Sequence, residues 1–91
     1  MRFEVTVKSI KGNCSAGISV GDTFKIDGFV LKSNHEGPVC LYALAAHIPY
    51  FNTIGRPTLS EDWINNVTEL ACPDVKNQVI FAVKRLGTYP F

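Results

Sequence analysis

The feature that most constrains the fold of this chain is a stretch without any charged residue, from Gly37 to Gly55. Its length approaches the roughly 20 apolar residues that a helix needs to span a bilayer. However, it contains Pro38, His47, Pro49 and Asn52, and its other residues are only moderately apolar. We therefore interpret the stretch as a helix buried in a protein interior and not as a membrane span.

The predicted main helix covers residues 38–51. Pro38 suits the first helical position, because its missing N–H would be unpaired there anyway. Pro49 is expected to bend or end the helix, because a proline ring clashes with the preceding turn. The bulky side, which we expect to pack on the rest of the domain, consists of Leu41, Leu44, Ile48 and Phe51.

The segments on either side of this helix predict strands. Residues 2–10 alternate apolar and polar side chains, the period of a half-buried strand. Residues 23–26 and 29–31 flank Asp27-Gly28, a favoured pair for a two-residue hairpin turn. Two further strands are predicted at 67–72 and 79–85, and Ser60, Glu61 and Asp62 predict the start of a short helix through Trp63.

This order of elements predicts the α+β class. Three strands precede the main helix and two follow it, joined by short connections, so the sheet of about five strands should be antiparallel. The length of 91 residues predicts a single domain over 1–91, with the main helix packed on one face of the sheet.

The charges exclude two classes of partner. Nine Lys and Arg against eight Asp and Glu give a formal net charge of +1, and the two signs are interspersed along the chain. Nucleic acids and anionic membranes both select for clustered cations, so we expect neither as a partner. A helix without charge on any side is expected to be buried on more than one side, which predicts a homo-oligomer.

The cysteines predict a reducing environment. There are three of them, widely spaced, and the first residues alternate and include Glu4, unlike a secretory signal peptide. We therefore expect a cytoplasmic protein with three free thiols.

Each cysteine lies at a junction between elements. Cys14 lies in a loop between glycines, Cys40 in the first turn of the main helix, and Cys72 at the end of a strand. One hypothesis is that all three bind zinc or an iron–sulfur cluster. Another is that Cys40 is a catalytic thiol, because the helix start favours a thiolate. The alternative to both is three half-buried structural residues, since the chain has no C-x-x-C pair.

The two histidines are weaker candidates. His47 follows Cys40 by seven residues, a rise of about 10 Å along a helix, so the two should not share an ion unaided. We interpret His47 as buried and hydrogen-bonded. His35 and Glu36 precede the helix and are expected to be solvated, with an approach to Cys40 as a base left open.

Several short motifs together resemble a family of small, uncharacterised prokaryotic proteins of about this length. They are Gly12-x-Cys14-x-x-Gly17 followed by Gly21-Asp22, Cys40 opening an apolar helix, and Cys72-Pro73-Asp74 before the last strand. The resemblance implies that the three cysteine positions belong to the family pattern, and it implies no activity. The chain departs from that pattern at Leu41, where a proline would follow the cysteine.

From these observations we expect a binding or interaction module that is homo-oligomeric, with its cysteines at a metal or ligand site. The alternative is a small thiol-dependent enzyme, or a subunit of one, that uses Cys40. The sequence leaves the choice between an enzyme and a binding module open, and it identifies no substrate.

Overall fold

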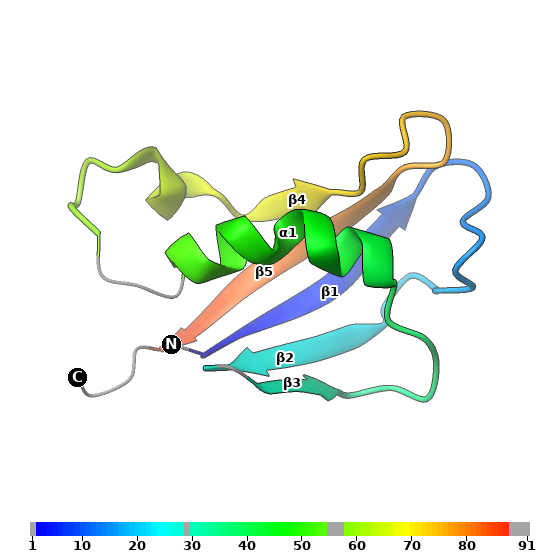
Figure 1. Ribbon diagram of the computed structural model, residues 1–91, viewed down its shortest axis with the longest axis horizontal. Coiled ribbons are helices and arrows are strands. Elements are labelled where there is room, and N and C mark those ends of the chain that lie inside the picture. Colours follow the sequence, from blue (N-terminus) through cyan, green and yellow to red (C-terminus); the bar gives the residue numbers. More distant parts are fainter. Residues whose placement is uncertain (1, 29, 55–57, 88–91) are drawn as a thin grey trace.

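Five strands form one antiparallel sheet, and a helix lies across one of its faces (Figure 1). The computed structural model describes residues 2–28, 30–54 and 58–87. The sheet order is β3-β2-β1-β5-β4, so the helix connects one edge strand to the other. The predicted α+β class and antiparallel sheet are confirmed. The elements are β1 (Arg2–Ile10), β2 (Thr23–Asp27), β3 (Val30–Ser33), α1 (Leu41–Ile54), the 3₁₀ helix η1 (Trp63–Asn66), β4 (Glu69–Ala71) and β5 (Val79–Gly87).

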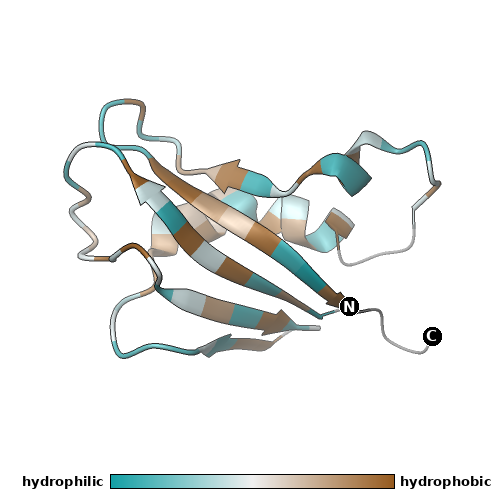
Figure 2. Ribbon diagram, turned by 180° about the vertical axis from the view of Figure 1, so that it is seen from behind, coloured by the Kyte–Doolittle hydropathy of each residue, from teal (hydrophilic) through white to brown (hydrophobic). Residues whose placement is uncertain are grey.

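The central strand β1 supplies the floor of the core. Val5 pairs with Phe24 of β2 on one side and with Val83 of β5 on the other. Paired residues point to the same face of a sheet, so the apolar positions of the three strands form one surface under α1. Figure 2 shows the alternation of apolar and polar bands along β1 and β5. The buried β1 residues are Phe3, Val5 and Val7.

The helix packs on this surface with a different side from the one predicted. The buried residues of α1 are Ala43, His47, Phe51 and Ile54. Leu41 is 70% exposed and Ile48 is 54% exposed, so the prediction was wrong for these two residues; it was right for Phe51 and in part for Leu44, which is half-buried against the core. The reason lies in the sheet: Phe3 and Phe81 already fill the space under the helix, and small Ala43 and planar His47 permit a closer approach than leucine and isoleucine would.

Pro49 does not end the helix, which continues to Ile54. A proline inside a helix removes the N–H that would bond to the carbonyl four residues earlier, here that of Ala45. Both residues are exposed, so that carbonyl can bond to water. Thr53 Oγ1 donates to the Pro49 carbonyl at 3.0 Å.

The helix begins at Leu41, three residues later than predicted, because Cys40 is its N-cap. The Leu44 N–H donates to the Cys40 carbonyl at 3.0 Å, which is the first bond of the helix.

Several of the predicted strand and turn boundaries shift. Asp27 pairs with Val30, so the hairpin turn holds Gly28 at φ +62° and not the pair Asp27-Gly28. Residue 29, predicted as the start of the next strand, lies outside the described residues. The strand predicted at 67–72 is shorter in the structure, where it forms β4. Its start is lost because Val67 donates its N–H to the Ile64 carbonyl and ends η1.

The predicted short helix is the single 3₁₀ turn η1, whose N-cap is Asp62. The Asp62 side chain accepts the Ile64 N–H at 3.0 Å. Arg85 of β5 holds the other end of this turn, because its guanidinium donates to the carbonyls of Val67 and Ile64 at 3.0 and 2.8 Å.

Candidate functional site

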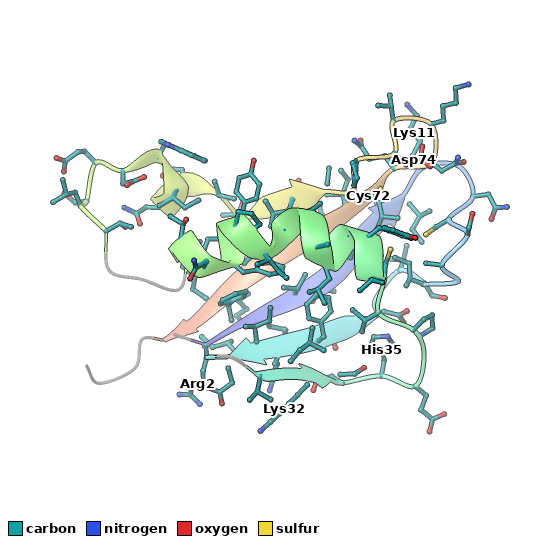
Figure 3. All side chains as sticks on the ribbon, in the orientation of Figure 1. Arg2, Lys11, Lys32, His35, Cys72 and Asp74 are labelled. Carbon is teal, nitrogen blue, oxygen red and sulfur yellow. The ribbon has the colours of Figure 1, made fainter. Side chains whose placement is uncertain are left out.

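Three irregular segments surround a pocket of about 530 Å³ at the end of the sheet where α1 begins. They are the loop after β1, the start of α1 and the β4–β5 connection. Cys14, Cys40 and Cys72 come from one segment each, and all three line the pocket. Figure 3 labels Cys72 and Asp74 at this corner of the molecule. We call this cavity the thiol pocket.

The rest of the lining is mainly apolar. Ile18 comes from the loop after β1, whereas Val79 and Phe81 come from β5 under the helix. Ile18 is a pocket residue that the sequence prediction, a loop between glycines around Cys14, misses. An isoleucine among glycines and serines was the available signal. The other apolar lining residues are Ala16, Pro38, Val39, Leu41, Tyr42, Ala43 and Pro73.

Cys40 contributes its sulfur to the cap of α1. The Ala43 N–H donates to Cys40 Sγ at 3.5 Å, so the sulfur takes the place that a serine or aspartate oxygen has in common N-caps. The side chain is half-buried. Cys40 therefore combines a structural role at the helix start with a place on the pocket wall.

Cys72 is held firmly in the β4–β5 connection. Its sulfur accepts the Val79 N–H at 3.2 Å and donates to the Asn77 carbonyl at 3.6 Å. Within the same connection, the Asp74 carboxylate accepts the N–H groups of Asn77 and Lys76. These bonds, that of Asn77 first, hold the pKa of Asp74 below its ordinary value of 3.8. The thiol of Cys72 is thus engaged as both donor and acceptor.

The loop that carries Cys14 is fastened to the same connection. The Asn13 N–H donates to Asn77 Oδ1 at 2.9 Å, and the Lys11 N–H donates to the Gln78 carbonyl at 2.8 Å. Gly12 lies between these two bonds at φ +81°, in close contact with Lys76 and Asn77. Two walls of the thiol pocket therefore hold each other in place.

The structure bears on the metal hypothesis through the spacing of these groups. Among residues 2–28, 30–54 and 58–87, no group of three or more His, Cys, Asp or Glu side chains is placed to hold one metal ion. Cys14, Cys40 and Cys72 share a pocket, but they do not converge on a single point. Zinc or an iron–sulfur cluster at these residues gains no support from this arrangement. All three cysteines are free thiols, as predicted.

His35 is part of a hydrogen-bonded cluster and not solvated as predicted. Its side chain is 14% exposed. The Nδ1 atom lies 2.7 Å from the Thr23 carbonyl, and Nε2 lies 3.2 Å from the Pro38 carbonyl. Two carbonyl acceptors require both ring nitrogens to donate, which only the imidazolium does. The Thr23 carbonyl foremost, then that of Pro38 and the Asp22 carboxylate, raise the pKa of His35 above 6.5.

These contacts decide how His35 relates to Cys40. A general base must offer a free lone pair to the thiol, and both nitrogens of His35 point at backbone carbonyls. In the described part of the chain no hydrogen bond joins this ring to the Cys40 thiol. His35 instead ties the segment before α1, a wall of the thiol pocket, to the start of β2.

His47 is buried and hydrogen-bonded, as interpreted from the sequence. Its side chain faces the sheet, and the residue is 4% exposed. The Nε2–H donates to the Ala71 carbonyl of β4 at 2.8 Å, and the ring lies edge-on to Phe51 and Phe81. His47 therefore fastens α1 to the edge strand and does not line the pocket.

A second candidate surface is the solvent side of α1. Its residues lie on one side of the helix and are all exposed: Leu41, Tyr42, Ala45, Ile48, Pro49 and Asn52. We call it the outer face of α1. No residue of α1 is charged, so this face is uncharged as well. Leu41 and Tyr42 belong both to this face and to the lining of the thiol pocket.

Comparisons with known proteins give no match: no family model, curated protein or solved structure is significantly similar to this chain. No helix in the described ranges is long and apolar enough to cross a membrane.

Proposed function

We propose that this protein is a homo-oligomeric binding module that holds a small, mainly apolar ligand in the thiol pocket. The observation that supports this is a cavity of about 530 Å³ that is lined by Cys14, Cys40 and Cys72 together with mainly apolar side chains. Small-molecule sites are typically concave, mainly apolar and about 300–1,000 Å³ in volume.

The lining favours an uncharged ligand. Thiols are weak hydrogen-bonding groups and behave as small, polarisable apolar residues. The Asp74 carboxylate at the pocket already accepts two backbone N–H groups. A strongly hydrated ion would lose its water here without equivalent partners. An aromatic or aliphatic molecule would instead bury apolar surface against Ile18, Val79 and Phe81.

Binding is favoured over catalysis because neither histidine accompanies a thiol. Both nitrogens of His35 are engaged with carbonyls, and His47 is bonded to β4. A catalytic Cys40, the alternative, would need an activating base within hydrogen-bond reach. Three free thiols in one pocket also fit the reducing conditions of the cytoplasm, where we place the protein.

The homo-oligomer part of the proposal is supported by the outer face of α1. Leu41, Tyr42 and Ile48 are 54–79% exposed on one side of one helix. Contiguous apolar surface of this kind commonly marks an interaction site. Because the face carries no charge, a second copy can meet it without like-charge repulsion, which favours a symmetric dimer.

Binding of the uncharged fluorescent probe 1-N-phenylnaphthylamine tests the ligand proposal. We expect fluorescence enhancement with the wild type and at least about a tenfold loss of affinity in Cys14→Phe, which fills the pocket. Val20→Phe is the matched control, because Val20 is exposed in the same loop and outside the lining. Equal probe affinity in wild type and Cys14→Phe, or no binding to the wild type, contradicts the proposal.

Reaction with a thiol reagent separates binding from catalysis. Three thiols that react with 5,5′-dithiobis(2-nitrobenzoate) at comparable, slow rates support the binding module. One thiol that reacts at least about a hundredfold faster, and disappears in Cys40→Ser, supports the thiol-dependent enzyme instead.

A further inference from the structure

The mouth of the thiol pocket and the outer face of α1 overlap. Leu41 and Tyr42 line the pocket, yet they are 70% and 79% exposed. Side chains deep in a pocket are shielded by the opposite wall, so this exposure places the two residues at the opening. The pocket is therefore unshielded on the side where α1 faces solvent.

Resting on the proposed function, we infer that a second copy of this chain closes the thiol pocket, so that self-association controls access to the cysteines. Pairing through the outer face of α1 covers Leu41 and Tyr42, the residues at the opening. In a two-fold arrangement each copy covers the pocket of the other, because the same surface is used on both sides.

The dimensions of the helix permit this arrangement. The 14 residues of α1 span about 21 Å at 1.5 Å per residue. Packed helices lie about 8–10 Å apart. Small Ala45 and the ring of Pro49 at the middle of the face allow such an approach. An antiparallel pair with full overlap then places the end of one α1 over the start of the other, where the opening lies.

The available area fits a weak dimer. Three large side chains contribute to the outer face of α1: Leu41, Tyr42 and Ile48, exposed by 54–79%. A fully buried aromatic side chain covers about 150–250 Å², so together the three offer on the order of 400 Å². This lies below the roughly 800 Å² per partner of standard interfaces and in the range of transient ones. Monomer and dimer should therefore both be accessible at laboratory concentrations.

The absence of charged residues on α1 favours a second copy of the chain over a partner that is recognised through charge. A partner recognised through complementary charge would find none on α1, and the charged residues of the chain lie elsewhere. Covering an apolar opening with an apolar face also lowers the free energy of any ligand-filled pocket. Linkage then requires that ligand binding strengthen dimerisation by the same factor by which dimerisation strengthens ligand binding.

The native cysteines report on the opening. The rate of thiol modification by 5,5′-dithiobis(2-nitrobenzoate) is measured over protein concentrations from about 1 μM to 1 mM, with the mass from light scattering at each concentration. We expect the second-order rate constant to fall at least about fivefold as the mass rises from monomer to dimer.

Two variants separate closure from concentration effects. Ala45→Glu places a charge on the outer face of α1, at a position where glutamate is a good helix former. We expect it to stay monomeric with the fast rate throughout. Ser9→Glu adds the same charge at an exposed position of β1, on the side of the sheet that faces away from α1. This variant should behave as the wild type.

The outcomes distinguish this inference from the proposed function. A wild type that dimerises with unchanged thiol reactivity overturns closure and leaves the dimer standing. A wild type that is monomeric up to 1 mM overturns both closure and the homo-oligomer, whereas the probe experiment still decides ligand binding. The wild-type series is sufficient even where Ala45→Glu fails to fold.

Discussion

Replacing Gly12 with alanine tests how the walls of the thiol pocket are held together. Gly12 has φ +81°, a conformation that a residue with a Cβ rarely adopts. A Cβ at this position would also lie 2.5 Å from Asn77 Oδ1 and 2.7 Å from the Lys76 carbonyl oxygen. The substitution therefore combines backbone strain with a steric clash.

Gly21 separates the two effects. It has φ +95°, but a Cβ there would meet no atom within 4 Å. Both alanine variants lose about 1–2 kcal/mol from the left-handed backbone conformation, and both reduce the entropy of the unfolded chain equally. Only Gly12→Ala must move the β4–β5 connection, which disturbs the bond between Asn13 N and Asn77 Oδ1. This bond is exposed to solvent, so its loss costs about 1 kcal/mol.

We therefore expect Gly12→Ala to lose about 2–3 kcal/mol of unfolding free energy and Gly21→Ala about 1–2 kcal/mol. Urea unfolding followed by circular dichroism measures both, with the slope of the transition checked for constancy. Probe binding should weaken only in Gly12→Ala, because the loop of Cys14 must shift. Equal losses of stability in the two variants would refute the close contact between the loop and the β4–β5 connection.

Three further predictions concern residues around the helix. The raised pKa of His35 stabilises the folded protein fully below about pH 6.5, and this contribution is lost as the pH rises through the raised value. The stability advantage of wild type over His35→Gln in urea unfolding should thus shrink from about pH 6 to pH 9, and an advantage that grows would contradict it. His47→Ala should lower the unfolding free energy by about 2–4 kcal/mol, through the lost bond to β4 and the cavity beside Phe81; a loss below about 1 kcal/mol in the same assay would count against it. Pro49→Ala should raise the thermal midpoint, because it restores the missing helical N–H and removes a residue that disfavours helix by about 3 kcal/mol, and a lowered midpoint would contradict this.

The elements that the sequence predicted best are those with a local period. Residues 2–8 alternate polar and apolar side chains, and this alternation reappears as the buried and more exposed residues of β1. The strand predicted at 79–85 lacks this alternation, because residues 79–83 are all apolar, but it is also present and is extended by two residues in β5. An alternating pattern shows which side of a strand is apolar, and it can be recognised without knowing which residues pack against that side.

The buried side of α1 could not be read in the same way. Almost every position of the helix is apolar or small, so the pattern marks no single side. Aromatic residues of the sheet determine which side of α1 is buried. The ring centroid of Phe3 lies 5.2 Å from that of Phe51, and the ring centroid of Phe81 lies 5.4 Å from that of His47. These partners come from strands far away in the sequence, and only their pairing register brings them under the helix.

The sequence indicated that the three cysteines belong to the candidate site, but not how their thiols are hydrogen-bonded. The positions of Cys14, Cys40 and Cys72 at element ends suggested that they meet at one end of the sheet, and they do line one pocket. Whether a thiol is free to bind a ligand depends on hydrogen bonds from residues nearby in space. For Cys72 these bonds come from Val79 and Asn77, whose approach depends on the turn built by Asp74.

The thiol pocket thus has an apolar lining but is held in place by two polar side chains, Asp74 and His35. Their pKa values are shifted in opposite directions. Asp74 shapes one wall, and its depressed pKa means that its contribution is complete above about pH 3.8 and is lost as the pH falls through the lowered value. His35 ties the wall before α1, and its raised pKa means that its contribution is complete below about pH 6.5 and is lost as the pH rises. Between these limits both walls are held by charged groups that lie beside the pocket. Binding of an uncharged probe should therefore be strongest in this interval, although neither probe nor thiols need change their own charge there.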